Sequence, residues 1–141
     1  MTPEQIELIE TSWERVEALG DAAFETFYRL LFEKAPEARA LFPDDMSNQR
    51  LKLRQTLALV VSSLRKLDVL APKVAALGAR HVEYGAKPEH YPVVGEALLE
   101  TLAGGLGEAW TQDVEGAWSA AYGLLSEVMI QAADSTATPA A

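Results

Sequence analysis

His81 offers the clearest chemistry in this chain by its residue type and position. Val74, Leu77 and His81 recur at helical spacing, so one helix would place all three on the same face. The chain contains two histidines and no cysteine. An imidazole on an apolar face can be a core side chain that hydrogen-bonds a neighbour, or it can give a neutral nitrogen to haem iron. The polar residues on other predicted helices bear on this choice.

Tyr28 and Gln49 are polar side chains on predicted faces that are otherwise apolar. Tyr28 shares its face with Leu31, so its hydroxyl needs a partner if it is buried, or else it reaches the surface. Gln49 begins a helix face that continues with Leu53 and Leu57. A glutamine in a first turn is often only solvated. Taken alone, each of these signals is weak.

Phe42 and Tyr91 are aromatic residues at predicted helix boundaries. Phe42 lies in an irregular corner before Pro43, where it could anchor a loop or hold a flat cofactor against the core. Tyr91 follows His81 at the start of the next helix, where its phenol could orient the imidazole. We interpret His90 as a loop or surface residue, because a turn precedes it.

Together these residues predict a haem pocket. His81 would give a neutral nitrogen to iron, and Phe42 would hold the ring system. Tyr28 and Gln49 would offer an O–H and an N–H on the opposite side. A hydrogen bond to a charged acceptor contributes about 1.5–3 kcal/mol, so two such donors would slow release of a diatomic ligand strongly.

The pattern along the chain predicts helices only, about six or seven in one domain. The boundaries rest on capping residues, prolines and glycines. The expected helices run from a Thr2–Gln5 capping box to Gly20, from Asp21 to Pro36, from a Ser47 cap to Leu64, from near Pro72 to Gly85 and Pro88, from His90 to Leu106, and from a Thr111 cap onward. Residues 36–47 are expected to be irregular. We predict a domain over residues 1–133 and a disordered tail over 134–141.

Composition excludes several classes of function. The chain has 141 residues and a net charge of −9, which argues against nucleic acid and anionic membranes. Its lack of cysteine excludes disulfides and thiolate metal sites. It shows no secretory signal, membrane span, phosphate-binding loop or hydrolase motif, so we expect a cytoplasmic protein.

The same residues lie in stretches that resemble the bacterial single-domain globins of the flavohaemoglobin type. The matching stretches are residues 24–32, 36–42, Arg80-His81 with Tyr84-Gly85, residues 90–95 and residues 118–123. The similarity covers almost the whole chain from Pro3 to Gln131. The block from His81 to Gly95 is its most specific part.

The resemblance implies an all-α globin fold, a three-over-three helical sandwich around haem b. It implies that His81 is the iron ligand, that Phe42 stacks on the porphyrin, and that Tyr28 and Gln49 lie on the opposite side. It also implies that Tyr91 contacts His81. The other lining residues that it implies are Leu53, Leu57 and Val94. It assigns no catalytic residue.

One position departs from the flavohaemoglobin pattern. That family pairs the tyrosine matched by Tyr91 with a glutamate on the last helix, whereas Ala133 aligns at that place here. Glu127 and Asp134 are the nearest acids, and neither is in register. The departure argues against peroxidase-like chemistry. The chain also ends without flavin and nicotinamide domains, so we expect electrons to come from an external reductase.

Three functional hypotheses follow. The first is reversible, tight binding of dioxygen for storage, transport or delivery. The second is a nitric oxide dioxygenase that uses a separate reductase, with nitric oxide or another diatomic molecule as a further ligand. The third is a haem-free helical signalling module. The expected partners are these small ligands, with no nucleic acid or membrane, and the expected state is a monomer or weak homodimer.

Overall fold

Six α-helices and two short 3-10 helices make up the described part of the chain. The computed structural model describes the backbone of residues 1–83 and 89–137 and the side chains of residues 1–81 and 89–132. The elements are α1 (Pro3–Ala18), α2 (Asp21–Lys34), η1 (Pro36–Leu41), α3 (Ser47–Ser63), α4 (Leu67–Glu83), α5 (His90–Leu106), η2 (Gly107–Ala109) and α6 (Gln112–Ala137). These residues contain no strand, which confirms the all-α prediction for them.

Several helix ends follow the predicted signals. The Gln5 N–H donates to the Thr2 hydroxyl at 3.1 Å, and the Thr2 N–H donates to the Gln5 side-chain oxygen at 3.0 Å, which completes the capping box. Gly20 separates α1 from α2 with a φ of 73°, a left-handed conformation that favours glycine. The Thr111 hydroxyl accepts the Val114 N–H at 3.2 Å near the start of α6.

Two predicted helix starts were wrong. Ser47 is the first residue of α3 and not its cap, because the Asp45 carboxylate accepts the Ser47 N–H at 2.9 Å. Helix α4 begins at Leu67 and contains Pro72 in its interior. The residues before the proline are helical because their packing requires it, since Leu70 is buried in the core. The corner predicted to be irregular contains η1.

The last helix runs to Ala137, so the predicted boundary after residue 133 falls within α6. Residues 138–141 lie outside the described part of the chain, as do Gly85 and Pro88, and the predicted tail stays a prediction. No helix in the described ranges is long and apolar enough to cross a bilayer.

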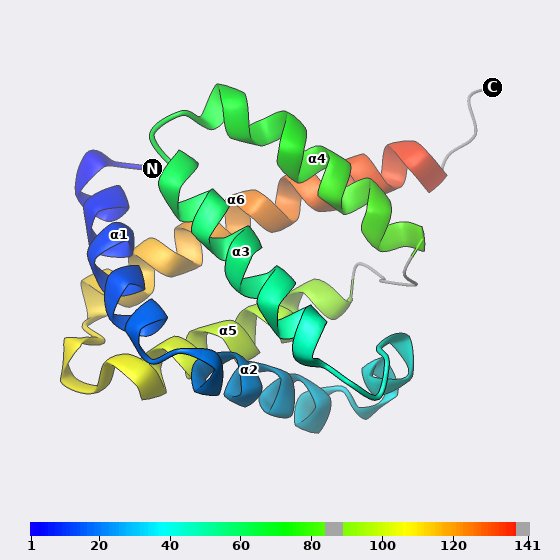
Figure 1. Ribbon diagram of the computed structural model, residues 1–141. Coiled ribbons are helices and arrows are strands. Elements are labelled where there is room, and N and C mark those ends of the chain that lie inside the picture. The colour runs from blue at the N-terminus through cyan, green and yellow to red at the C-terminus, as the bar shows by residue number, and fades with distance from the viewer. Residues whose placement is uncertain (84–88, 138–141) are drawn as a thin grey trace.

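The packing of the helices leaves α3 and α4 in front of α5 and α6 (Figure 1). The most extensive contacts join α4 to α6, α2 to α5 and α1 to α6. Trp13 and Trp118 lie in the core as predicted, with ring centroids 6.5 Å apart, and the Trp118 N–H donates to the buried Ser12 hydroxyl at 2.8 Å. Contacts between α3 and α4 are few, and both helices contribute to the wall of the candidate site.

Candidate functional site

A cavity of about 720 Å³ lies among α2, α3, α4, α5 and α6, beside the η1 corner. Protein interiors normally pack as densely as organic crystals, so a void of this size indicates a binding site for a small molecule. Its wall includes all eight residues singled out from the sequence: Tyr28, Phe42, Gln49, Leu53, Leu57, His81, Tyr91 and Val94.

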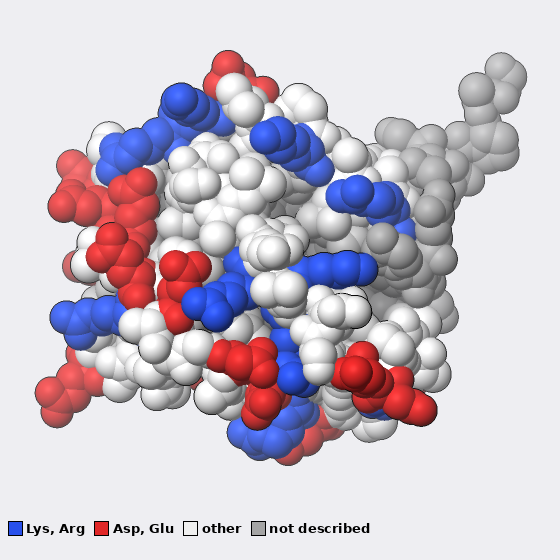
Figure 2. All heavy atoms as spheres, in the orientation of Figure 1, with Lys and Arg blue, Asp and Glu red and all other residues white. Residues whose placement is uncertain are grey.

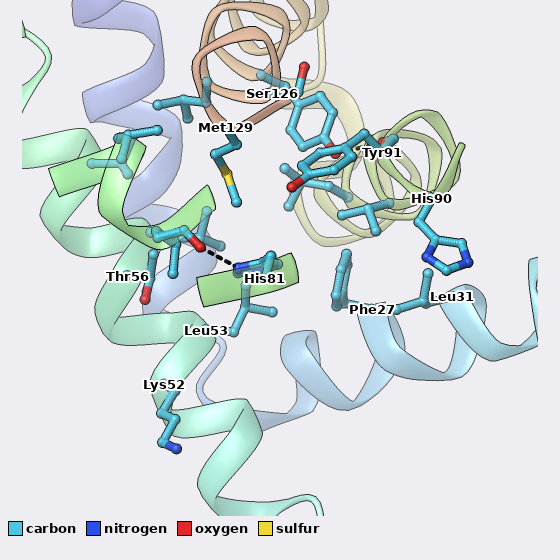
Figure 3. Close-up of a pocket in the computed structure, with 18 of the residues that line it drawn as sticks. Phe27, Leu31, Lys52, Leu53, Thr56, His81, His90, Tyr91, Ser126 and Met129 are labelled. Carbon is cyan, nitrogen blue, oxygen red and sulfur yellow. Dashed lines mark hydrogen bonds between the residues drawn. The ribbon is translucent and has the colours of Figure 1, made fainter. Parts of the chain in front are cut away.

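His81 projects from α4 into this cavity and is half-buried (Figure 3). Its Nδ1 lies 2.8 Å from the Leu77 carbonyl oxygen one turn earlier. A carbonyl can only accept, so this contact places the proton on Nδ1 and leaves a lone pair on Nε2 of the neutral ring. Burial lowers the pKa of His81, the Leu77 carbonyl opposes this shift, and Arg80 adds to it. The site therefore favours the neutral imidazole, the form that binds a metal.

Tyr28 and Gln49 meet on a different part of the wall. The Tyr28 side chain is 6% exposed, and the Gln49 amide donates to its hydroxyl oxygen at 3.2 Å. Burial raises the pKa of Tyr28, which the Gln49 hydrogen bond partly opposes. Because the phenol oxygen accepts here, its own proton is available for an acceptor in the cavity. The two alternatives, a surface hydroxyl and a solvated glutamine, do not describe these residues.

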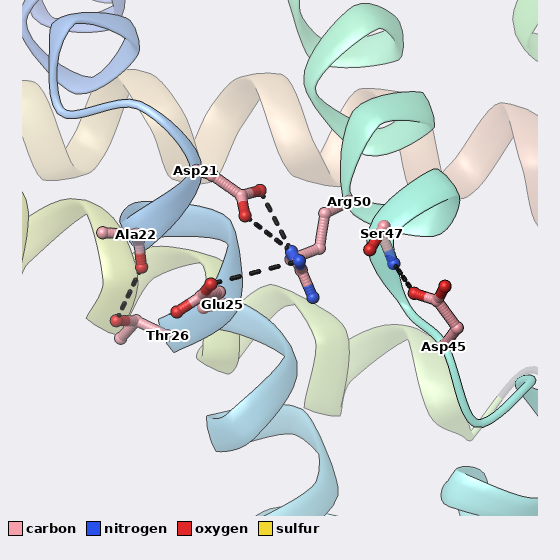
Figure 4. A network of polar contacts seen from close by, with 7 residues as sticks. All are labelled: Asp21, Ala22, Glu25, Thr26, Asp45, Ser47 and Arg50. Carbon is pink, nitrogen blue, oxygen red and sulfur yellow. Dashed lines mark hydrogen bonds and ion pairs between the residues drawn. The ribbon is translucent and has the colours of Figure 1, made fainter.

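An ion pair connects the first turn of α3, which carries Gln49, to the start of α2 (Figure 4). The Arg50 Nε lies 3.0 Å from both carboxylate oxygens of Asp21, and a second guanidinium nitrogen lies 4.0 Å from Glu25. At the start of α3, the Asp45 carboxylate accepts the Ser47 N–H, and this hydrogen bond lowers the pKa of the Asp45 carboxyl. Such exposed pairs contribute little energy, so this one adds only slightly to the packing of α3 against α2.

Phe42 is held at the η1 corner by aromatic contacts and a cation. Its ring centroid lies 5.7 Å from that of Tyr28 and 5.5 Å from that of Phe32, both edge-on. The Arg39 guanidinium sits 5.3 Å from the Phe32 centroid and donates to the Phe42 and Pro43 carbonyls at 3.2 and 2.9 Å. Phe42 is therefore a fixed part of the wall.

The first turn of α5 supplies two residues of the wall. Tyr91 lies there as predicted, with its ring directed into the pocket (Figure 3), and burial raises the pKa of its phenol. The expected contact between this phenol and His81 stays a prediction. His90 also lines the cavity and is half-buried, and it is the first residue of α5, so its interpretation as a loop residue was wrong.

The wall has two cationic residues that the sequence argument missed, Lys52 on α3 and Arg80 on α4. No Asp or Glu lines the cavity among the described residues, although the chain has 21 acids and 12 bases. In the view of Figure 2, several Lys and Arg side chains lie toward the centre and others lie at the upper left, left and lower edges, while Asp and Glu lie mainly at the left and lower edges. The helical spacing from Gln49 would have indicated Lys52 and Thr56. The cavity therefore suits an apolar ligand with anionic groups.

Two further wall residues, Tyr122 and Met129, come from α6. The methionine belongs to a close crossing of helices, since a side chain at Gly78 of α4 would place its Cβ 2.5 Å from the Met129 carbonyl oxygen. The aligned position Ala133 and the stretch Tyr84-Gly85 lie outside the described side chains.

Comparisons with known proteins show the family to which this sequence is similar. The globin family model matches residues 25–129. A flavohemoprotein of Deinococcus radiodurans is 34% identical over 133 residues, covering 92% of this chain and 33% of the relative. A flavohemoprotein of Vibrio cholerae is 33% identical over 135 residues, covering 92% and 34%. The chain thus spans about a third of the length of these relatives.

Solved structures give the same result. A bacterial globin of Campylobacter jejuni aligns with a TM-score of 0.82 and 25% identity, covering 95% of this chain and 97% of the other. An engineered carbene transferase, derived from a Rhodothermus marinus protein named as a nitric oxide dioxygenase, aligns with a TM-score of 0.86 and 26% identity, covering 97% and 96%. The family match extends over most of the chain, and the predicted fold class is confirmed. The chain belongs to the globin family.

Proposed function

We propose that this chain binds haem b in the cavity through His81 and holds dioxygen reversibly beneath Tyr28 and Gln49. The observation that carries this proposal is one large cavity that the His81 imidazole lines from one helix and a hydrogen-bonded phenol–amide pair lines from two others. The globin family and the flavohemoprotein relatives imply a haem cofactor.

The residues of the wall fit such a group. Haem, when bound, would supply an iron atom that can bind a diatomic ligand. His81 would present Nε2, and Phe42 would pack on the flat ring. Lys52 and Arg80 would hold the two carboxylates, since they are the Lys and Arg side chains that line the described cavity. Leucine and valine side chains of α3 and α5 would exclude water.

Tyr28 would be the principal donor to dioxygen. Its oxygen already accepts the Gln49 amide, so its proton is directed elsewhere. Gln49 would orient the Tyr28 phenol and would therefore act on the ligand only indirectly. Loss of a hydrogen bond to a charged acceptor costs about 1.5–3 kcal/mol, which corresponds to roughly a 10- to 150-fold faster release.

A second candidate function is nitric oxide dioxygenation. The observation that favours it is the structural similarity to a protein named as a nitric oxide dioxygenase, together with the flavohemoprotein relatives. That activity needs repeated electron delivery, which we propose would come from an external reductase.

Two measurements on haem-loaded protein test these proposals. The first is the absorption spectrum in the ferric, ferrous and oxygen-equilibrated forms, where we expect a Soret band and a reversible change with oxygen. No Soret band after haem is supplied would support the haem-free signalling module. The second is nitrate yield with nitric oxide, a reductase and nicotinamide. Yield limited to one turnover supports oxygen binding, and sustained yield supports the dioxygenase.

A further inference from the structure

Tyr122 of α6 joins the wall of the cavity to the backbone of α5. Its hydroxyl donates to the Tyr91 carbonyl at 2.6 Å. Tyr91 is the second residue of α5, and its own side chain lines the same cavity. The bond therefore connects α6 to the turn that places the Tyr91 ring.

The Tyr122 ring fits this turn because residue 95 is a glycine. A Cβ added to Gly95 would lie 2.8 Å from Tyr122 Cε2, closer than real Cβ contacts allow, and 3.0 Å from Cδ2, which is tighter than most. Gly95 lies one helical turn after Tyr91, so the ring packs across the first turn of α5. Ring packing and the hydroxyl bond thus act on the same turn.

The hydroxyl of Tyr122 is committed to this contact. A phenol has one proton to donate, and here it goes to a backbone carbonyl. A carbonyl oxygen has two lone pairs, so the Tyr91 carbonyl can accept Tyr122 and still serve the helix. Although Tyr122 lines the cavity, it is therefore not suited to donate to a bound ligand.

We propose that Tyr122 is a positioning residue for the His81 side of the cavity. By fixing the first turn of α5, it holds the Tyr91 ring where its phenol can orient the His81 imidazole. This inference rests on the proposed haem-binding function. It assigns to Tyr122 an effect on the iron–histidine bond that is separate from the action of Tyr28 and Gln49.

The test is the iron–histidine stretching band of the ferrous haem-loaded protein, measured by resonance Raman spectroscopy. In Tyr122→Phe, which keeps the ring and removes the hydroxyl, we expect the band to broaden and move to lower frequency. Oxygen affinity should change about threefold to tenfold, the effect of one net hydrogen bond. Tyr28→Phe should change oxygen release and leave this band in place.

A double-mutant cycle with Tyr91→Phe separates positioning from general destabilisation. If Tyr122 acts through the Tyr91 phenol, adding Tyr122→Phe to Tyr91→Phe should move the band little further. A shift of undiminished size in that background would overturn the inference. So would an unchanged band in the single variant.

Gly95→Ala provides a second variant that keeps both tyrosines. Its Cβ should displace the Tyr122 ring and move the band in the same direction, and an unmoved band would count against the inference. Gly104→Ala is the matched control on α5, because a Cβ there meets nothing within 4 Å. If the wild-type protein shows no iron–histidine band at all, both the proposed function and this inference fail. A normal wild-type band that neither Tyr122→Phe nor Gly95→Ala moves overturns only the inference.

Discussion

The Tyr28 side and the His81 side of the cavity are built by different kinds of contact. On the Tyr28 side, one side chain is held by another, since Gln49 donates to Tyr28 at 3.2 Å. On the His81 side, polar side chains contact backbone carbonyls, at Leu77 for His81 and at Tyr91 for Tyr122. A backbone carbonyl stays in place while its helix is intact, whereas a side-chain partner can be lost by one substitution.

This difference implies different tolerance to change. Substitution on the Tyr28 side should adjust ligand release while leaving the pocket intact. On the His81 side, α4 is pressed against α6 so closely that a Cβ at Gly78 would lie 2.5 Å from the Met129 carbonyl oxygen. Changes at His81 or at this crossing of α4 and α6 should alter whether a cofactor is held at all.

The largest effect should come from His81→Ala. It removes the proposed iron ligand, so we expect most haem to be lost on gel filtration, with the Soret band shifted in what remains. Exogenous imidazole should restore part of the wild-type spectrum by filling the space. Normal haem content and an unchanged spectrum in this variant would refute the ligand assignment.

Tyr28→Phe should have the next largest effect. It keeps the aromatic contacts of the Tyr28 side and removes the proton that we propose is donated to the ligand. Oxygen dissociation, followed by stopped-flow absorbance, should be about 10- to 150-fold faster, with haem content unchanged. An unaltered rate would mean that the hydroxyl points elsewhere.

Gln49→Met should have a smaller effect, because Gln49 acts on Tyr28 and not first on the ligand. We expect oxygen dissociation to be about two- to tenfold faster, as for loss of one neutral hydrogen bond. Combined with Tyr28→Phe, it should add little, since the two residues share one contact. Full additivity would show that Gln49 donates independently.

The smallest effect should be the pH dependence of the haem-free protein. Burial lowers the pKa of His81 below its ordinary value of 6.5, so the unfolded chain binds the proton more readily. The free energy of unfolding should therefore fall as pH drops below 6.5 and level off below the folded pKa. In denaturant titrations from about pH 8 to 5, His81→Gln should lessen this dependence. An identical dependence in both proteins would contradict the assignment of this effect to the lowered pKa of His81.

The helices and most of the candidate site followed from the sequence because local patterns specify them. The Thr2–Gln5 capping box and the spacing from Val74 to His81 rely on neighbours within a turn or two. Pro72 misled the prediction for α4, since burial of Leu70 outweighs the cost of an internal proline.

The contacts that organise the site could not be predicted in the same way, because they join distant segments. Arg50 reaches Asp21 across 29 positions, and Tyr122 reaches Tyr91 across 31. The type of residue, arginine or tyrosine, does not indicate which distant residue it contacts. From the sequence alone, either residue could equally be an ordinary surface or core side chain. Gly95 could have given a hint, because an interior glycine in a helix often marks close approach by another group.

The central claim is that the imidazole of His81 binds haem iron opposite Tyr28 and Gln49. A crystal structure of the haem-loaded protein tests this most directly. The account predicts continuous density from His81 Nε2 to the iron, with the Tyr28 hydroxyl and the Gln49 amide over the other face. Density that shows His81 turned away from the porphyrin, with another side chain as the iron ligand, would contradict it.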